Sequence, residues 1–197
     1  MRVLGIDPGY AIVGWGVVDY AGNRFAPVDF GAVCTDAGVP FERRLDEVYA
    51  VVKDVIERTQ PEVLAIEKLF YQHNQTTVIG VAEARGVILL AAAQAGLPIY
   101  EYTPMQVKQA VTGSGRAEKP QIQAMMVRIF SLPENPQADA ADAMACALTA
   151  AQTEAMTALT GAAKTSMGNA RFTSRGGAKS SRRAWAARVA EMKGDKP

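Results

Sequence analysis

Two carboxylates stand directly after apolar runs that are typical of buried β-strands. Asp7 follows residues 2–6 (RVLGI), and Glu67 follows residues 62–66 (EVLAI). A buried carboxylate without a partner is costly, so Asp7 must either cap a turn or hold a cation. Pro8-Gly9, which follows it, predicts a turn at which the backbone and a substrate can approach closely.

Two further acids, Asp139 and Asp142, lie three residues apart in the run ADAADAMACAL. Side chains at this spacing share one face of a helix. Asp139 alone has an ordinary explanation, because an acid near a helix N-terminus gains ~0.3–1 kcal/mol from the helix dipole. Asp142 fits that explanation less well, since it lies beside Ala145 and Cys146 on an otherwise apolar helix.

Each of the four acids could be structural, but together they predict a metal site. The two strands are expected to be neighbours and the helix can pack across the sheet, so the four carboxylates can converge. They would then repel one another unless divalent cations neutralise them, and hard oxygen ligands suit Mg²⁺ or Mn²⁺. The charge of two such ions balances that of four carboxylates. A pair of ions ~3.5–4 Å apart is also the arrangement that holds the attacking and the leaving oxygen in phosphodiester hydrolysis. This chemistry needs no His, Ser or Cys nucleophile.

The elements around these acids predict an α/β domain with a mixed five-stranded sheet flanked by helices. Alternating polarity predicts an antiparallel meander of three strands, and a helix followed by an apolar strand indicates a parallel crossover beside the first strand. The predicted strands are 2–6, 12–20, 24–33, 62–66 and 97–101, and the predicted helices are 43–58, 76–95, 104–111, 120–131 and 138–151.

Composition indicates a soluble, cytoplasmic protein. Of the 197 residues, 49% are hydrophobic and 21% charged, and the chain starts with no secretory signal pattern. The longest apolar stretch, residues 78–95, contains Glu83 and Arg85, which argues against a membrane span. The two cysteines, Cys34 and Cys146, have no disulfide or metal-ligand spacing, and we expect both thiols to be buried.

Charge divides the chain into an acidic body and a basic tail. Residues 160–197 contain nine Lys or Arg against two acids, a net charge of +7, whereas the preceding residues carry −6. We therefore predict a nuclease domain at residues 1–155 and a basic, mostly disordered tail at residues 156–197. The tail could contact phosphates without sequence preference, or it could only aid solubility.

Four stretches resemble, in order, the motifs of the RuvC family, the bacterial Holliday-junction resolvases. They are GIDPG, IEKLF, QVKQAVTGSGRAEKPQI and ADAADAMACAL, and the resemblance covers roughly residues 1–153. It implies an RNase H-like fold and a homodimeric endonuclease that makes paired, symmetric, metal-dependent nicks in four-way junction DNA during recombination and repair. It also implies that Asp7, Glu67, Asp139 and Asp142 are the catalytic metal ligands, and that the protein works with the RuvA–RuvB branch-migration complex.

The same resemblance implies three DNA-binding residues. Phe70 matches an aromatic that stacks on a base near the junction centre, and Lys108 and Lys119 match lysines that contact DNA. Each could instead be ordinary, as a core or interface phenylalanine and as solvated lysines. His73 stands where a more basic residue is expected, so it is a weaker candidate for a DNA contact.

Two other classes of protein remain to be weighed. An actin-like kinase or ATPase shares an Asp-x-Gly turn after its first strand but needs two such lobes, for which this chain is too short. A branched-DNA-binding module without catalysis would share the lysines. The intact acids argue against it, because an inactive protein has no use for their repulsion.

Overall fold

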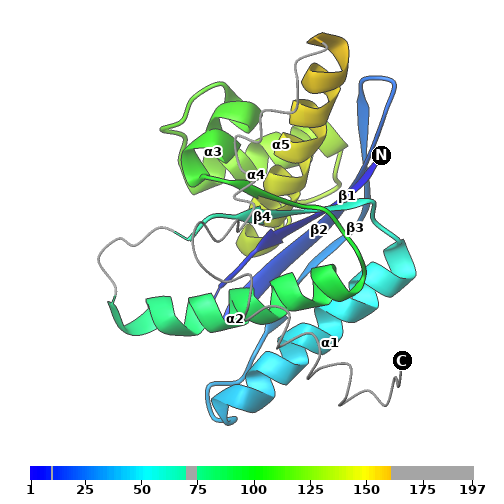
Figure 1. Ribbon diagram of the computed structural model, residues 1–197. Helices are drawn as coiled ribbons and strands as arrows, with labels where there is room; N and C mark the ends of the chain where they lie inside the picture. Colours follow the sequence, from blue (N-terminus) through cyan, green and yellow to red (C-terminus); the bar gives the residue numbers. More distant parts are fainter. Residues whose placement is uncertain (10, 70–74, 161–197) are drawn as a thin grey trace, which may run out of the picture.

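The structure, a computed structural model, describes residues 1–9, 11–69 and 75–160 and contains the predicted mixed five-stranded sheet (Figure 1). The strand order is β3-β2-β1-β4-β5. The strands are β1 (Arg2–Asp7), β2 (Ile12–Ala21), β3 (Arg24–Cys34), β4 (Val63–Glu67) and β5 (Ile99–Tyr102). The first three strands pair antiparallel, whereas β4 pairs parallel with β1 and β5 parallel with β4, which confirms the predicted topology.

Helices cover both faces of this sheet, so the fold has three layers (Figure 1). The helices are α1 (Phe41–Thr59), α2 (Gln75–Gln94), α3 (Pro104–Thr112), α4 (Lys119–Phe130) and α5 (Ala138–Thr160). One core lies between the sheet and α3, α4 and α5, and includes Val3 and Val63. The other lies between the sheet and α1 and α2, and includes Leu4 and Leu64. Because strand side chains alternate between faces and both faces are covered, residues 3–6 of β1, at the centre of the sheet, form an unbroken apolar run.

Helix α5 is longer than the sequence predicts. It continues past residue 151, and past the predicted domain boundary at residue 155, to Thr160. The threonine hydroxyls of Thr149, Thr153 and Thr157 each donate a 2.8 Å hydrogen bond to the carbonyl four residues earlier, so they fit the helix without leaving polar groups unpaired. The predicted tail from residue 161 onward lies outside the described residues, and its separation from the domain stays a prediction.

The two cysteines differ in environment. Cys146 on α5 is buried, as expected, but the prediction of a buried Cys34 is wrong. Cys34 is the last residue of β3, which forms one edge of the sheet, so no strand covers it on that side.

Within the described ranges, no helix is long and apolar enough to cross a membrane.

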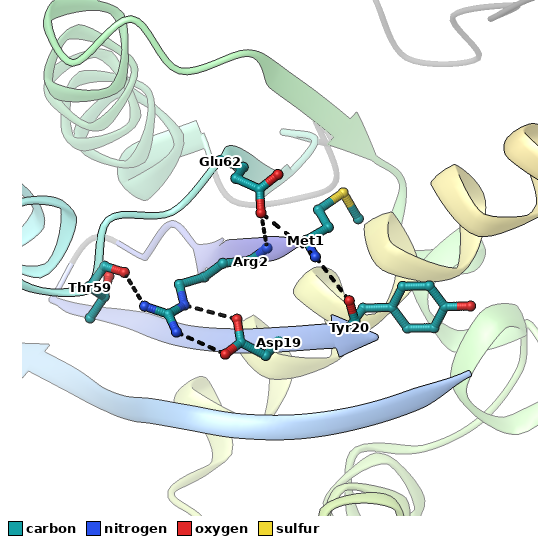
Figure 2. A network of polar contacts seen from close by, with 6 residues as sticks. All are labelled: Met1, Arg2, Asp19, Tyr20, Thr59 and Glu62. Atoms are coloured by element: carbon teal, nitrogen blue, oxygen red, sulfur yellow. Dashed lines mark hydrogen bonds and ion pairs between the residues drawn. The ribbon is translucent and has the colours of Figure 1, made fainter. Parts of the chain in front are cut away.

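A polar network ties the start of β1 to its neighbours (Figure 2). The guanidinium of Arg2 donates two 2.8 Å hydrogen bonds to the carboxylate of Asp19 on β2 and one of 2.6 Å to the carbonyl of Thr59 at the end of α1. The backbone N–H of Arg2 donates to Glu62 Oε1 at 2.8 Å, just before β4. These contacts anchor one end of β1, and Asp7 stands at the other end.

Candidate active site

Neighbouring parallel strands bring Asp7 and Glu67 to the same edge of the sheet. Strands β1 and β4 pair with Ile6 opposite Ile66, and each of the two acids is the last residue of its strand. The carboxyl ends of parallel strands are a usual place for ligand sites in open α/β sheets. The side chains of both acids are half-buried.

Close packing of α5 on the sheet brings the other two acids to this edge. Gly14 on β2 lies opposite Asp7, and a Cβ at Gly14 would collide with the carbonyl oxygen of Asp139 in the first turn of α5. A Cβ at Gly5 on β1 would likewise collide with the backbone of Ala143. Only glycine permits this approach, and it carries the helix face with Asp139 and Asp142 against the end of β1.

A cavity of about 220 Å³ lies where these elements meet. Three acids, two lysines and an apolar wall line it: Asp7, Glu67, Asp142, Lys108, Lys119, Pro104, Val107 and Ile122. Asp139 does not line the cavity, although its negative charge contributes to raising the pKa of Asp7. The sequence thus predicted five of the residues around the cavity. It gave no signal for the apolar wall, because Val107 and Ile122 have the spacing of ordinary core residues.

Burial and mutual repulsion make the two strand-end acids weak. Burial, followed by the negative charge of Asp142, raises the pKa of Asp7 to about 7. Burial, followed by the charges of Asp7 and Asp142, raises the pKa of Glu67 to about 7, although Lys119 and Lys108 oppose the shift. Two carboxyls that ionise only near neutral pH are the expected result of acids crowded without enough positive charge.

Lys119 supplies part of that positive charge. Its Nζ lies 3.0 Å from Asp142 Oδ2, although the lysine side chain is 66% exposed. The hydrogen bond with Asp142 raises the pKa of Lys119, and the charges of Asp7 and Asp139 act in the same direction. Lys119 is the first residue of α4, with Pro120 next to it, and from there its ammonium reaches Asp142 on α5.

The donor set fits a hard divalent cation. Carboxylates from three separate elements surround one small cavity, and oxygen donors of this kind suit Mg²⁺ or Mn²⁺. With side chains as they stand in the described part of the chain, no three His, Cys, Asp or Glu groups are close enough together to hold one ion. Asp142 is instead paired with the Lys119 ammonium, so that pair must open if Asp142 is to bind a metal.

The remaining candidates, Phe70 and His73, follow β4 in the sequence and lie outside the described residues. Leu69, just before them, exposes 37% of its surface, and β4 therefore leads from the cavity to an exposed apolar position.

The sequence of this chain matches one family along most of its length. The family model described as "Crossover junction endodeoxyribonuclease RuvC" matches residues 3–150. The protein of that name from Brevibacillus brevis is 52% identical over 156 residues, which are 79% of this chain and 94% of the relative. The chain belongs to the RuvC family. The same family name is carried by a relative from Caldanaerobacter subterraneus that is 52% identical over 149 residues, 75% of this chain and 90% of the relative.

Solved structures of RuvC share the fold. RuvC from Thermus thermophilus, in a structure described as a complex with Holliday junction substrate, is 39% identical to this chain with a TM-score of 0.75. The match covers 79% of this chain and 96% of that one. The yeast mitochondrial Holliday junction resolvase, at 13% identity and a TM-score of 0.60 over 78% of each chain, shares the fold alone. The expected RNase H-like architecture and the membership in the crossover junction endodeoxyribonucleases are confirmed.

Proposed function

We propose that this protein resolves four-way (Holliday) junctions in homologous recombination and DNA repair by paired, symmetric nicks. The observation that carries the proposal is the cavity in which Asp7, Glu67 and Asp142 face Lys108 and Lys119. Clustered carboxylates suit metal-dependent phosphodiester hydrolysis, and lysines at the same cavity suit a phosphate. Membership in the RuvC family and the junction complex of the Thermus thermophilus relative support the same substrate.

Asp7, Glu67, Asp139 and Asp142 would hold Mg²⁺ or Mn²⁺, with two ions in each site. When bound, the ions supply charge stabilisation at the attacking and leaving oxygens of the phosphodiester. Before that, Asp7 and Glu67 must lose their protons, because the pKa of each is about 7. The ion pair between Lys119 and Asp142 must also open, which frees the ammonium to bind a phosphate oxygen.

The other predicted site residues have roles in binding. Lys108 and Lys119 would contact the DNA backbone and orient it over the carboxylates. Phe70 would stack on a base near the junction centre, a contact that contributes ~1–3 kcal/mol for an aromatic side chain.

We propose a homodimer, because paired nicks need two sites related by a two-fold axis. Helix α2 supports this, since it is apolar on two sides. Ile88 is buried in the core, whereas Ile79 exposes 64% of its surface and Leu90 exposes 50%. Ile79 and Leu90 lie 11 residues apart, about three helical turns, and so share one outward face. Between them Gly86 has open space around its Cβ position, which lets another helix approach.

We also propose a cellular setting, which the family resemblance supports. In the cytoplasm, the protein would act on chromosomal junctions together with the RuvA–RuvB branch-migration complex. A homodimer seated on one junction would expose the faces away from α2 to such a partner.

A nicking assay tests the proposal. Purified protein is mixed with a labelled synthetic four-way junction, or with linear duplex of the same sequence, in Mg²⁺, Mn²⁺ or chelator. We expect paired nicks on the junction alone and only with metal. Tight binding without nicks in any metal would favour the alternative, a branched-DNA-binding module.

Single substitutions separate binding from chemistry. Asp7→Asn removes a proposed metal ligand but no phosphate contact, so it should abolish nicking while junction binding persists. Asp46→Asn is the matched control, because Asp46 is an exposed acid on α1, across the sheet from the cavity. Loss of binding in a folded Asp7→Asn protein would contradict this division of roles.

A further inference from the structure

Helix α4 borders a second hollow beside the active site. Lys119 and Ile122 face the carboxylate cavity, whereas Gln121, Met125 and Arg128 line a more open hollow of about 780 Å³. The loop between α3 and α4 forms the rest of its wall, so the two hollows share one short helix and one loop.

Two arginines give this hollow its chemistry. Arg116 lies in the loop before α4 and Arg128 in the last turn of α4, and both are exposed. Neither guanidinium forms an ion pair with any residue in the described ranges. Glu118 also lines the hollow, so the two arginines leave it with a net positive charge. Guanidinium groups bind phosphate through paired N–H donors, which suits them to a nucleic-acid backbone.

Side-chain hydrogen bonds, chiefly those of Gln109, hold the loop that carries Arg116 in place. Gln109 Nε2 donates to the carbonyl of Gly113 at 2.8 Å, and its Oε1 accepts from the N–H of Gly115 at 3.1 Å. Gly113 has φ of 76°, a left-handed conformation that glycine adopts without strain. The N–H of Ala117 closes the loop on the carbonyl of Ser114 at 3.2 Å. Arg116 is therefore presented from a pre-organised loop, which lowers the entropy lost on binding.

The second hollow lies farther along α3 than the cavity, and it lies on another side of α4. On α3, Lys108 lines the cavity and Thr112, one turn later on the same face, lines the second hollow. On α4, Lys119 and Arg128 are nine residues apart, or about 14 Å along the helix axis at ~1.5 Å per residue, and two and a half turns place them on opposite sides of the helix. A DNA strand rises ~3.4 Å per phosphate, so the two side chains are separated by at least about four nucleotides.

We propose that Arg116 and Arg128 bind backbone phosphates of a junction arm, with the Arg128 contact at least about four nucleotides from the phosphate that is cut. This inference rests on the proposed function, since it assigns a second contact to the same DNA. The two arginines hold the arm in register, while Lys108, Lys119 and the carboxylates act on the phosphate at the cavity. They are positioning residues and take no part in the chemistry.

The test measures junction affinity against salt concentration for the full-length protein in chelator, which prevents nicking. Each phosphate contact contributes ~0.9 to the slope of log K against log [salt]. The double variant Arg116→Ala/Arg128→Ala should therefore lower the slope by ~1.8. Its nicking rate at subsaturating junction in Mg²⁺ should fall together with its affinity. The control is Arg24→Ala/Arg43→Ala, which removes two exposed arginines from β3 and α1 and should leave the slope unchanged.

Neutral phosphates locate the contact. Methylphosphonates placed four or more nucleotides from the cut should weaken binding of the unmodified protein and have no effect on the double variant. Arg116→Lys/Arg128→Lys keeps the charge but loses the paired donors, so it should keep the slope and bind more weakly. Circular dichroism of each variant checks the fold.

Distinct results overturn the two proposals. If the unmodified protein nicks junctions and the double variant has the same salt slope, the contact does not exist while the proposed function stands. Equal sensitivity of both proteins to methylphosphonates would likewise show that the two arginines make no such contact, while the proposed function stands. If the unmodified protein neither binds nor nicks junctions, the proposed function itself fails.

Discussion

Replacing Asp7 by asparagine should stabilise the metal-free protein, although it removes a proposed metal ligand. The pKa of this carboxyl rises from 3.8 to about 7 because the group is buried beside other acids. Between these two values the folded protein keeps a proton that the unfolded chain has lost, so stability falls as the pH rises through that range. Asparagine carries no charge and removes this loss.

The size of the effect follows from the shift. At ~1.36 kcal/mol per pKa unit, the raised pKa of Asp7 lowers the free energy of unfolding by roughly 4 kcal/mol at pH 8 and only about 1–2 kcal/mol at pH 5. The buried asparagine amide has no hydrogen-bond partner, which lowers the free energy of unfolding by about 1–3 kcal/mol and offsets part of the stabilisation. We therefore expect a net stabilisation of about 1–3 kcal/mol at pH 8, or roughly 3–8 °C in Tm, and almost none at pH 5.

Differential scanning calorimetry in excess chelator at the two pH values measures this. Asp142→Asn is an informative comparison, because it also removes repulsion but breaks the 3.0 Å ion pair with Lys119, so its gain should be smaller. Exposed Asp46→Asn should leave Tm unchanged. A lower Tm for Asp7→Asn at pH 8, or an equal shift at both pH values, would refute the idea of a crowded carboxylate cluster. Added Mg²⁺ should raise Tm of the unmodified protein more than that of Asp7→Asn.

Three further predictions concern the elements around the site. Gly14→Ala should lower the free energy of unfolding in urea by ~1–3 kcal/mol and reduce nicking, because the new Cβ displaces the first turn of α5. The control Gly38→Ala, in an open loop, should change neither stability nor nicking. Lys119→Ala should move the acidic limb of the nicking pH profile to higher pH, because Lys119 lowers the pKa values of Asp7 and Glu67. Lys119→Arg keeps the charge and should leave the limb in place, whereas an unmoved limb in the alanine variant would contradict this electrostatic coupling. Arg2→Ala should cost ~1.5–3 kcal/mol in urea by removing charged hydrogen bonds to Asp19 and Thr59, and a loss no larger than that of Arg24→Ala would count against the network.

The sequence predicted the strand-end acids because their position follows from local rules. Apolar runs that end in Asp7 and Glu67 place both acids at one edge once the strands are parallel neighbours, and spacing along the helix pairs Asp139 with Asp142. The approach of α5 was also readable in principle. Gly14 and Gly16 alternate on the strand face that meets α5, and glycines so placed often mark close backbone contact.

The ion pair between Lys119 and Asp142 could not be predicted in this way. It depends on how α4 packs on α5, and no local pattern specifies the contact. The end of α5 was missed for a different reason. Thr153 and Thr157 weaken intrinsic helix propensity beyond residue 151, and the sequence does not show that their hydroxyls bond to carbonyls one turn earlier within the continuing helix. The exposure of Cys34 likewise depends on its place at a sheet edge.

The acids and the lysines of the cavity stand on parts of the fold that we expect to differ in local stability. Asp7 and Glu67 end β1 and β4, which have a paired strand on each side and helices over both faces. Backbone amides there, such as those of Ile6 and Ile66, should exchange with deuterium only through global unfolding. Lys119 is the first residue of the 12-residue helix α4, and we expect this exposed first turn to exchange faster than the strands. Fraying of that turn would move the ammonium while the strand-end acids stay in place, so a bound DNA strand would be released without disassembling the acids.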